Sequence, residues 1–226
     1  MLYDKWRPKT WDAFAGHAGQ VRKLRAMLER PSFGGGALWV TGPSGSGKTT
    51  LAHLCAASVQ ASDWDIVELD GDKCTVDAVR QIDRDMGKRG GMFGGSGWRV
   101  WIVNEAHAMT PRAVQAWLTL LEGLPDKRLV IFTTTERGEQ DLFGQFTGPL
   151  LSRCAHVSLF CDGSAADKSD PGGTKNLLAA AEYLRTVAQA EGLDGQPVSA
   201  YVGLLRRKSG NLRAALCAIE AGEMLT

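Results

Sequence analysis

The fold of this chain is decided by Gly42-Pro43-Ser44-Gly45-Ser46-Gly47-Lys48-Thr49, which lies between an apolar run, Leu38-Trp39-Val40, and a helix-like segment that begins at Thr50. Its glycines let the backbone wrap closely enough for N–H groups to point at phosphate oxygens, and the helix that follows adds its positive N-terminal end. Lys48 supplies a positive charge, and Thr49 offers a hydroxyl to Mg²⁺. Because the required strand precedes this stretch and the required helix follows it, the pattern predicts a phosphate-binding loop, residues 42–50, rather than an ordinary connection.

The length is enough for one nucleotide-binding domain of ordinary size and a smaller unit. The chain has 226 residues, of which 44% are hydrophobic, and this suits a core of ordinary size. The 26 Lys and Arg residues nearly balance the 25 Asp and Glu residues, so any contact with nucleic acid must be local. No apolar run approaches the ~20 residues that span a bilayer, and the first residues have no signal-peptide core, so we expect a cytoplasmic protein without membrane contact.

The cysteines indicate neither a zinc site nor a disulfide framework. The chain has 5 cysteines, an odd number, and no two of them form a C-x-x-C pair. Cys55 and Cys217 stand in apolar helical patterns, where we expect small buried core residues. We therefore assign no metal to the cysteine side chains and expect no zinc.

Short apolar segments recur along the chain and alternate with helical patterns. After residues 37–41, strand-like segments are expected at 66–69, 100–103, 129–132 and 156–159. Apolar residues at helical spacing are found at about 21–30, 75–86 and 111–124. This alternation predicts an α/β fold in which a parallel five-stranded sheet has helices on both faces.

A stretch of small, polar and turn-forming residues, about 161–173, breaks this alternation and marks a domain boundary. The segments after it are all helical, at about 174–191, 197–208 and 211–222. We therefore predict two domains, a nucleotide-binding domain over residues 1–162 and a small three-helix domain over residues 163–226.

A second polar motif follows the third predicted strand. Val100-Trp101-Ile102-Val103 leads into Asn104 and Glu105, which therefore stand at the carboxyl edge of the sheet, where open α/β sheets bind ligands. Phosphoryl-transfer ATPases usually have Asp-Glu here: the Asp holds Mg²⁺, often through water, and the Glu polarises the attacking water. The alternative is a solvated strand end, which the phosphate-binding loop earlier in the chain disfavours.

The Asn104-Glu105 pair predicts an ATPase with an altered metal site. Asn104 can still accept a hydrogen bond from metal-bound water, but it carries no charge, so we expect lower Mg²⁺ affinity and slow hydrolysis. Glu105 is the candidate general base. We expect a rate that is stimulated by DNA and that rises in Asn104→Asp.

Several motifs fall in the order, and near the spacing, found in AAA+ clamp loaders. They are Trp6-Arg7-Pro8-Lys9-Thr10, the phosphate-binding loop, Asn104-Glu105-Ala106-His107, Leu118-Thr119-Leu120-Leu121-Glu122, Thr133-Thr134-Thr135, Leu151-Ser152-Arg153-Cys154 and Gly210-Asn211-Leu212-Arg213-Ala214-Ala215-Leu216. From residue 3 to about 222, the chain resembles the bacterial gamma/tau subunit of DNA polymerase III and replication factor C small subunits. The resemblance implies a P-loop AAA+ fold, in which ATP and Mg²⁺ bind between a Rossmann-like ATPase domain and a helical lid.

The resemblance also implies roles for single residues. Lys48 would bind the phosphates and assist catalysis, Thr134 or Thr135 would match sensor 1, which hydrogen-bonds the γ-phosphate or the attacking water, and Arg213 would match sensor 2 in the lid. Arg153 resembles the arginine finger that reaches into a neighbouring subunit's ATP, where a fixed guanidinium offsets transition-state charge. The residues implied to line the adenine pocket are Tyr3, Arg7, Pro8 and Gly16. For each arginine taken alone, a surface ion pair of little energetic value is the alternative.

Three features depart from the family pattern. Asn104 replaces the usual Asp, the cysteine zinc module of the bacterial gamma/tau subunit is absent, and the chain stops after the lid, where clamp loaders continue into a helical collar domain. Such a chain would assemble through its ATPase faces, depend on partner subunits, form no ring of the usual kind, or be a fragment of a longer protein.

Contact with DNA is indicated by local positive charge. Lys88, Arg89 and Arg99 flank a glycine-rich segment, residues 87–97, and Arg112 opens the helix after Glu105. Local clusters of this kind suffice to neutralise phosphates. A solvated loop explains residues 87–97 equally well.

As a whole, the sequence predicts an ATPase subunit of a DNA polymerase sliding-clamp loader, which acts in a homo- or hetero-oligomer on a sliding clamp and primer-template DNA in DNA replication. In that mechanism ATP binding closes the subunits and hydrolysis releases them. Two alternatives remain open: another DNA-processing AAA+ motor, of the Holliday-junction branch-migration type, and a scaffold subunit that senses nucleotide and hydrolyses it weakly.

Overall fold

The computed structural model describes residues 1–88, 96–135, 148–159 and 174–225. The chain divides into two compact units. We call residues 1–23, 42–50 and 158–226 the helical unit, and residues 24–41 and 51–157 the sheet unit. The domain boundary predicted between residues 162 and 163 falls outside the described residues and stays a prediction.

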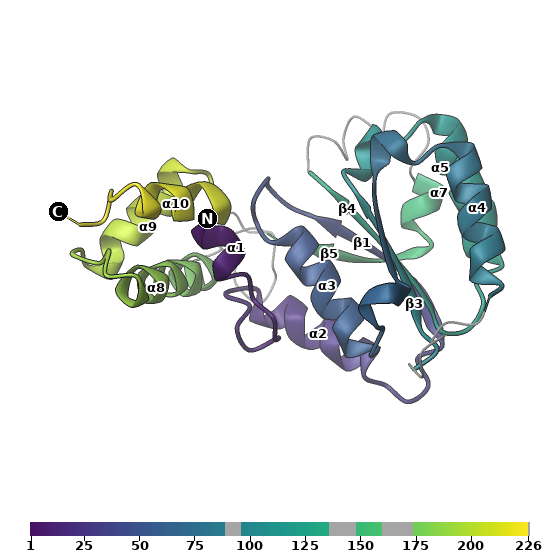
Figure 1. Cartoon of the computed structure of the whole chain (residues 1–226), viewed down its shortest axis with the longest axis horizontal. Coiled ribbons are helices and arrows are strands. Elements are labelled where there is room, and N and C mark those ends of the chain that lie inside the picture. Colours follow the sequence, from purple (N-terminus) through teal and green to yellow (C-terminus); the bar gives the residue numbers. More distant parts are fainter. Residues whose placement is uncertain (89–95, 136–147, 160–173, 226) are drawn as a thin grey trace. The chain divides into compact units, whose positions relative to one another are not determined.

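The sheet unit is built around a five-stranded sheet (Figure 1). Its strands are β1 (Gly35–Thr41), β2 (Ile66–Asp70), β3 (Arg99–Asn104), β4 (Arg128–Thr134) and β5 (Cys154–Ser158). Within the described residues they follow the order β2-β3-β4-β1-β5, and the β2–β3, β3–β4 and β4–β1 pairs are parallel. The predicted parallel sheet is therefore confirmed, although β5 begins two residues before the expected segment.

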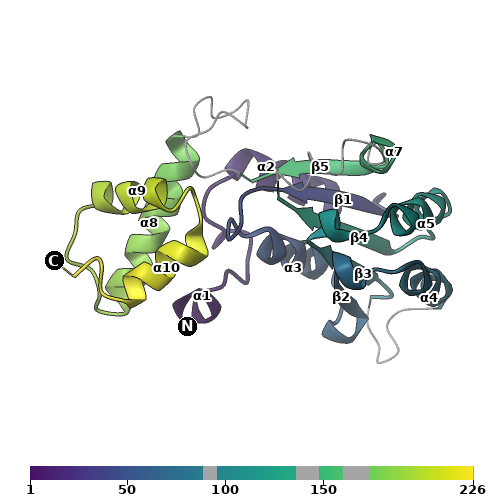
Figure 2. The same ribbon diagram turned by 90° about the horizontal axis from the view of Figure 1, so that it is seen from above.

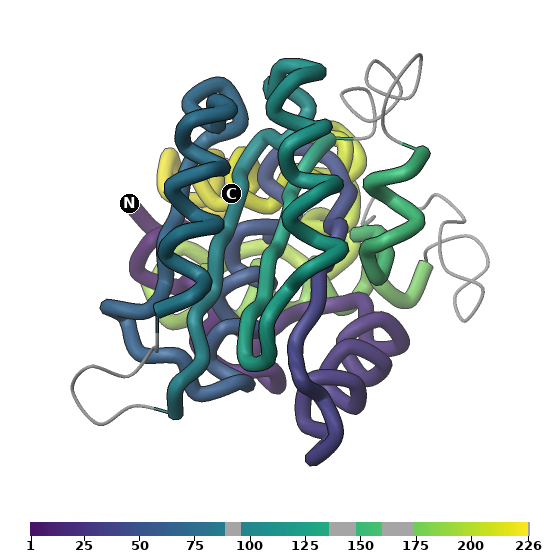
Figure 3. The backbone as a smooth tube through the Cα atoms, turned by 90° about the vertical axis from the view of Figure 1, so that its right-hand side faces the viewer, coloured from purple at the N-terminus to yellow at the C-terminus, as the bar shows by residue number. Residues whose placement is uncertain are grey.

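One face of this sheet carries large side chains that pack under helices. Trp39 of β1 and Phe132 of β4 are fully buried, and Trp117 meets Phe132 edge-on with ring centroids 5.1 Å apart. The covering helices are α4 (Val76–Met86), α5 (Pro111–Glu122) and α7 (Gly148–Leu151). Figure 3 looks onto this layer, and the buried residues of all three helices form one core with the sheet.

The bounds of these helices follow from their first residues. The side chains of Thr75 and Thr110 cap α4 and α5 by accepting hydrogen bonds from Ala78 N and Ala113 N, which satisfies backbone donors that have no partner inside the helix. Pro111 then opens α5, where the fixed φ of proline suits the first turn. Both predicted helices are confirmed to within two residues.

The other face of the sheet is covered by α2 (Ala18–Leu28) and α3 (Lys48–Ser58), as Figures 1 and 2 show. Leu51 and Cys55 of α3 are fully buried, so the prediction that Cys55 is a core residue is confirmed. Helices thus lie on both faces, as the alternation of strands and helices predicted. Short 3-10 turns lie at Asp63–Asp65 (η1), Gly71–Lys73 (η2) and Ala106–Ala108 (η3).

The helical unit has its own apolar core. It contains α1 (Leu2–Lys5), α8 (Thr174–Ala190), α9 (Val198–Arg207) and α10 (Leu212–Glu220), and the last three match the predicted helices to within two residues. The indole N–H of Trp6 donates to Glu191 over 2.8 Å, and the hydroxyl of Tyr183 donates to the Trp6 carbonyl over 2.6 Å. The N-terminal segment is therefore fastened to α8 and to the residue that follows it.

The prediction that Cys217 is a core residue is wrong. Its side chain is exposed, whereas Ala215, Leu216 and Ile219 of the same helix are buried. The inward stripe of α10 follows these positions, and residue 217 falls outside it. No helix among the described residues is both long enough and apolar enough to cross a membrane.

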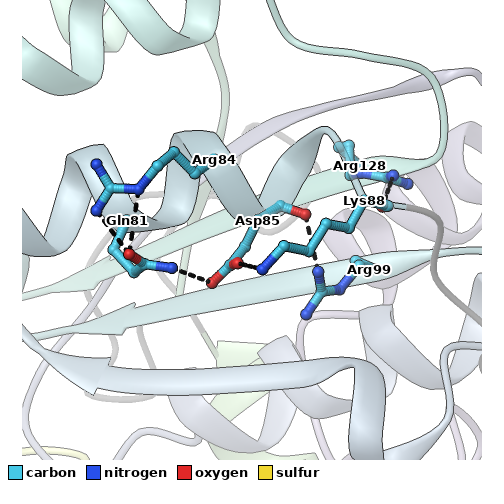
Figure 4. Close-up of polar contacts among 6 residues, drawn as sticks. All are labelled: Gln81, Arg84, Asp85, Lys88, Arg99 and Arg128. Carbon is cyan, nitrogen blue, oxygen red and sulfur yellow. Dashed lines mark hydrogen bonds and ion pairs between the residues drawn. The ribbon is translucent and has the colours of Figure 1, made fainter.

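A buried arginine joins three segments of the sheet unit, and Figure 4 shows its contact with Lys88. Arg128 is 6% exposed. Its guanidinium donates to the carbonyl oxygens of Met86 over 2.9 Å, Lys88 over 2.7 Å and Lys127 over 3.0 Å. Burial, followed by the nearby charge of Arg99, lowers the pKa of Arg128 from its ordinary value. Its charge is compensated mainly by backbone carbonyls at the end of α4. These carbonyl oxygens would otherwise lack hydrogen-bond donors, because they lie at a helix C-terminus.

We expect Arg128→Met to lower the free energy of unfolding by about 2–4 kcal/mol, because several buried carbonyl oxygens lose their donor at once. Arg84→Met is the matched control, since Arg84 lies on the same α4 helix but is exposed and, within the described ranges, its side chain donates only to Gln81. That change should stay within about 0.5 kcal/mol. Chemical denaturation measures both values, and equal losses would contradict the role given to Arg128.

Candidate functional site

The candidate residues fall into two groups, one in each unit. In the helical unit, the phosphate-binding loop begins directly after β1 and runs into α3. The ammonium of Lys48 lies 3.0 Å from the carbonyl oxygen of Gly42 and 2.9 Å from that of Pro43. Lys48 is only 6% exposed. Its charge is therefore held over the loop by the loop's own backbone, at the start of a helix.

The tip of the loop is packed so closely that only glycine fits. Gly45 has a φ of 71°, and a Cβ there would overlap the side-chain amide of Asn211. Asn211 caps α10 by accepting from Ala214 N over 2.9 Å, and Leu212 N donates to the Gly45 carbonyl over 3.1 Å. The first turn of α10 is thus bonded to the tip of the loop, and the next residue of that turn is Arg213.

The loop also contains an unsatisfied polar atom. Ser46 is 1% exposed, and its hydroxyl is a buried side-chain oxygen without a hydrogen-bond partner in the described structure. Such atoms are rare in proteins and call for an explanation. Together with the Lys48 ammonium and the N-terminal end of α3, this hydroxyl suits a loop that receives phosphate oxygens.

The residues implied to contact adenine lie in three places within the helical unit. The guanidinium of Arg213 lies over the ring of Tyr3, 5.6 Å from its centroid, so these two predicted residues are brought together. Arg7 is exposed and pairs with Asp4 at 3.5 Å, and Pro8 follows it. Gly16, with a φ of 77°, packs against the backbone of Asn176 in α8. None of these positions tests the implied roles, which stay predictions.

In the sheet unit, polar side chains gather where β3 and β4 end. The amide nitrogen of Asn104 donates to a carboxylate oxygen of Glu68 in β2, and the hydroxyl of Thr133 donates to the amide oxygen of Asn104 over 3.1 Å. The second oxygen of Glu68 lies 3.1 Å from the ring nitrogen Nε2 of His53 in α3. Asn104 therefore stands beside a carboxylate from the neighbouring strand.

Glu105 follows in a left-handed backbone conformation, with φ 49° and ψ 47°. Non-glycine residues seldom adopt it, and it costs roughly 1–2 kcal/mol. Gly71 packs directly on the Glu105 carbonyl, where a side chain would collide. The carboxylate itself is half exposed, with a side-chain exposure of 52%. The tight backbone therefore presents this carboxylate to solvent.

His107 connects Glu105 to the predicted sensor. Its Nδ1 atom lies 3.0 Å from the hydroxyl of Thr134 and 3.5 Å from the carboxylate of Glu105. Thr134 is fully buried, whereas Thr135 follows the end of β4. The structure thus brings Glu105 and Thr134 to one place, with an imidazole between them.

Arg153 lies at a different end of the sheet unit, just after α7. It donates to the Pro149 carbonyl over 2.8 Å and pairs with Glu122, at the end of α5, at 2.5 Å. Its side chain is 34% exposed. It also lines a pocket of about 250 Å³ together with Asp126, Leu121, Leu124 and the start of β1. The guanidinium is accessible and is held by one carboxylate.

Some of the basic residues predicted to contact DNA already interact with other residues of the sheet unit. Lys88 pairs with the Asp85 carboxylate at 2.5 Å, which lowers the pKa of Asp85. Arg99 donates to the Asp85 carbonyl over 2.8 Å and lies over the ring of Trp101 (Figure 4). Arg89 and most of the glycine-rich segment lie outside the described residues, and Arg112 is exposed. Contact with DNA stays a prediction.

The donor atoms near Asn104 suit a hard cation that arrives with phosphates. Glu68 and Asn104 offer carboxylate and amide oxygens in the sheet unit. Mg²⁺ is usually bound by one or two such side chains, with water and substrate phosphates completing its shell. Among the described residues, no cluster of three or more His, Cys, Asp or Glu side chains could hold a metal by itself.

Sequence reasoning gave no individual role to several neighbours of the predicted residues. They are Glu68, Thr133, His107 and His53 in the sheet unit, and Phe14 and Asn211 in the helical unit. One signal was present: Glu68 is a charged residue one position before the end of the expected strand 66–69. The others depend on contacts between segments distant in the sequence.

The chain is similar in sequence to clamp-loader subunits. The chain is 28% identical to a replication factor C small subunit of Haloarcula marismortui, over 94% of this chain and 61% of the relative. It is 26% identical to a DNA polymerase III subunit gamma/tau of Mycoplasma pneumoniae, over 68% of this chain and 24% of the relative. The resemblance to clamp-loader subunits is thereby confirmed, although the chain spans less than two thirds of these relatives.

The fold is shared with solved structures. The Holliday junction branch migration motor RuvB of Thermotoga maritima matches with a TM-score of 0.67 and 20% identity, over 95% of this chain and 64% of that one. At this identity the likeness shows the fold alone. The family model of the AAA ATPase domain matches residues 13–193, and the chain therefore belongs to the AAA ATPase domain family.

Proposed function

We propose that this chain binds ATP at the phosphate-binding loop and hydrolyses it. The observation that carries this proposal is the loop itself: a buried Lys48 ammonium, an unsatisfied Ser46 hydroxyl and the start of α3 meet within it. Membership of the AAA ATPase domain family supports adenine nucleotides as the ligand.

In this proposal each group of residues has a distinct task. Residues 42–50 and Lys48 bind the phosphates, and Tyr3, Arg7, Pro8, Gly16 and Arg213 contact the nucleotide from the N-terminal segment and α10. Glu105 takes the proton of the attacking water, while Thr134 or Thr135 donates a hydrogen bond to the γ-phosphate or to that water. Mg²⁺, held by Thr49 and through water by Asn104, would offset the negative charge of the phosphates when bound.

We further propose that the ATPase serves as a cytoplasmic subunit of a DNA polymerase clamp loader. The named relatives support this assignment, because they include replication factor C small subunits and gamma/tau subunits of DNA polymerase III. The partners are then other clamp-loader subunits, a sliding clamp and primer-template DNA. The proposal includes slow hydrolysis, since Asn104 stands where this class of ATPase usually has Asp.

The nucleotide proposal is tested by Lys48→Ala. Binding of a fluorescent, non-hydrolysable ATP analogue should weaken about 10–100-fold, because a charged hydrogen-bond donor to phosphate is lost. Lys88→Ala is the control, since Lys88 is exposed and pairs only with Asp85 among its described contacts, and its affinity should equal that of the unaltered protein. A protein that binds no adenine nucleotide would end this proposal.

The clamp-loader assignment is tested by mass measurement in solution. The chain is measured with and without the ATP analogue, and a sliding clamp and primed DNA are then added in turn. We expect an assembly that depends on nucleotide and gains mass with both additions. A chain that binds ATP but never the clamp, and instead stimulates strand exchange at four-way junctions, would support the branch-migration alternative.

A further inference from the structure

The contact between Asn104 and Glu68 links the altered metal position to a carboxylate in the next strand. Glu68 pairs in register with Ile102, two residues before Asn104, so all three side chains lie on the same face of the sheet. The Asn104 amide nitrogen donates to Glu68, and its amide oxygen accepts from Thr133 over 3.1 Å. The orientation of this amide is therefore fixed from both sides.

The chemistry of the partners makes this orientation the favourable one. An ionised carboxylate only accepts hydrogen bonds, so Glu68 requires the NH₂ end of the amide, and the Thr133 hydroxyl can donate to the other end. An Asp at position 104 has no such donor. It would place a second negative charge against Glu68, which is destabilising at this separation. Asn104 is thus matched to Glu68 in shape and in charge.

We propose that Glu68 supplies the negative charge that an Asp at position 104 would supply toward the Mg²⁺ of bound ATP, and that Asn104 positions it. This inference rests on the proposed ATP site. The Glu68 side chain is 39% exposed, so a carboxylate oxygen is accessible to metal-bound water. Its other neighbour, His53, approaches from α3 with a side chain that is 38% exposed. Glu68 in β2 and Asn104 in β3 would together provide the positioned negative charge that one Asp usually provides.

The test separates charge from hydrogen bonding. In Glu68→Gln the new amide oxygen still accepts from Asn104, so the hydrogen bond remains while the charge is lost. The measured quantity is the ratio of the dissociation constants of the ATP analogue in EDTA and in Mg²⁺. In the unaltered protein Mg²⁺ should strengthen binding, and Glu68→Gln should reduce that strengthening about 10–100-fold, the usual effect of removing a group that supports a bound metal.

The sharpest comparison uses the exchanged pair, the double variant in which Asn104→Asp is combined with Glu68→Gln. In Asn104→Asp alone, Mg²⁺ should strengthen binding of the ATP analogue no more than in the unaltered protein. This variant should also melt at a lower temperature, because two carboxylates then face each other. Adding Glu68→Gln to that variant lets the new amide donate to the new carboxylate, and both the Mg²⁺ dependence and the melting temperature should recover. Asp77→Asn, which removes a charge at an exposed position paired with Arg80, should change neither.

The outcomes distinguish this inference from the proposed function. If the unaltered protein binds no ATP analogue with or without Mg²⁺, the proposed function fails. If it binds and Mg²⁺ strengthens binding, but Glu68→Gln keeps the full effect, the charge does not reside on Glu68 and the inference fails. It fails equally if Mg²⁺ has no influence on the unaltered protein, or if the exchanged pair behaves like Asn104→Asp alone. Melting curves without nucleotide identify any variant that has lost its fold.

Discussion

Arg153→Ala is expected to lower the kcat of ATP hydrolysis by about 10³–10⁵-fold, the range typical of an arginine finger, while ATP binding is retained. We propose that the Arg153 guanidinium, which resembles an arginine finger, completes the site of an adjoining subunit and touches charge that develops only in the transition state. Removing it therefore costs rate rather than affinity. Steady-state hydrolysis and binding of the ATP analogue, measured on the same preparations, give the two quantities.

The alternative is that Arg153 serves only in a surface ion pair, and a second variant is the control for that alternative. Arg153 is held by Glu122 and by the Pro149 carbonyl, and an exposed pair of this kind contributes only about 0–1 kcal/mol to stability. Glu122→Gln removes the same pair but leaves the guanidinium. It should preserve hydrolysis, and a loss as large as that of Arg153→Ala would mean that the pair itself matters.

Mixing two inactive variants tests whether Arg153 acts on a neighbour. A Lys48→Ala subunit binds ATP only weakly but presents Arg153, and an Arg153→Ala subunit binds ATP but lacks the guanidinium. At an interface between the two kinds, one intact site is formed, so mixtures should regain part of the activity that neither variant has alone. Absence of any recovery in mixed oligomers would contradict action between subunits.

Glu105→Gln is expected to lower kcat by about 10²–10⁴-fold with little change in affinity, because the amide cannot take a proton from water. The carboxylate is half exposed and lies 3.5 Å from His107, which also contacts Thr134. Glutamine keeps the length of the side chain and the left-handed backbone cost of the position. We therefore expect an unchanged melting temperature, so that the kinetic loss reports chemistry.

The control for this prediction is a carboxylate that belongs to the same unit but lies outside the site. Glu122→Gln serves again, since Glu122 ends α5 and pairs with Arg153. Single-turnover hydrolysis of bound ATP excludes product release as the slow step. If Glu105→Gln turns over ATP at the original rate, Glu105 is not the base.

Much of the fold could be predicted because its signals are local. The apolar runs of β1, β3 and β4 are continuous, as expected for strands covered on both faces, and Gly45 and Gly47 occupy the turn conformations that glycine permits. The α4 and α5 helices follow from Thr caps and 3.6-residue spacing. Position 217 was mispredicted because a short helix with several small residues defines its inward stripe poorly.

The site was predicted only as single residues. Lys48, Asn104 and Glu105 could be named from their motifs, but the motif did not indicate that the Asn104 amide donates to Glu68. The expected gain in Asn104→Asp rested on treating residue 104 alone. With Glu68 beside it, the same change adds repulsion, and the expected result is reversed unless Glu68 is changed as well.

The sequence by itself determined the glycine-rich turn between β1 and α3, the order of strands and helices, and the family of the chain, because each depends on residue types at fixed spacing along the backbone. Only the tertiary structure decided which side chains surround those residues: Glu68 and Thr133 at Asn104, His107 between Glu105 and Thr134, and Asn211 at Gly45. These contacts join residues far apart in the chain. Strand register and helix packing set them, and no local pattern encodes either.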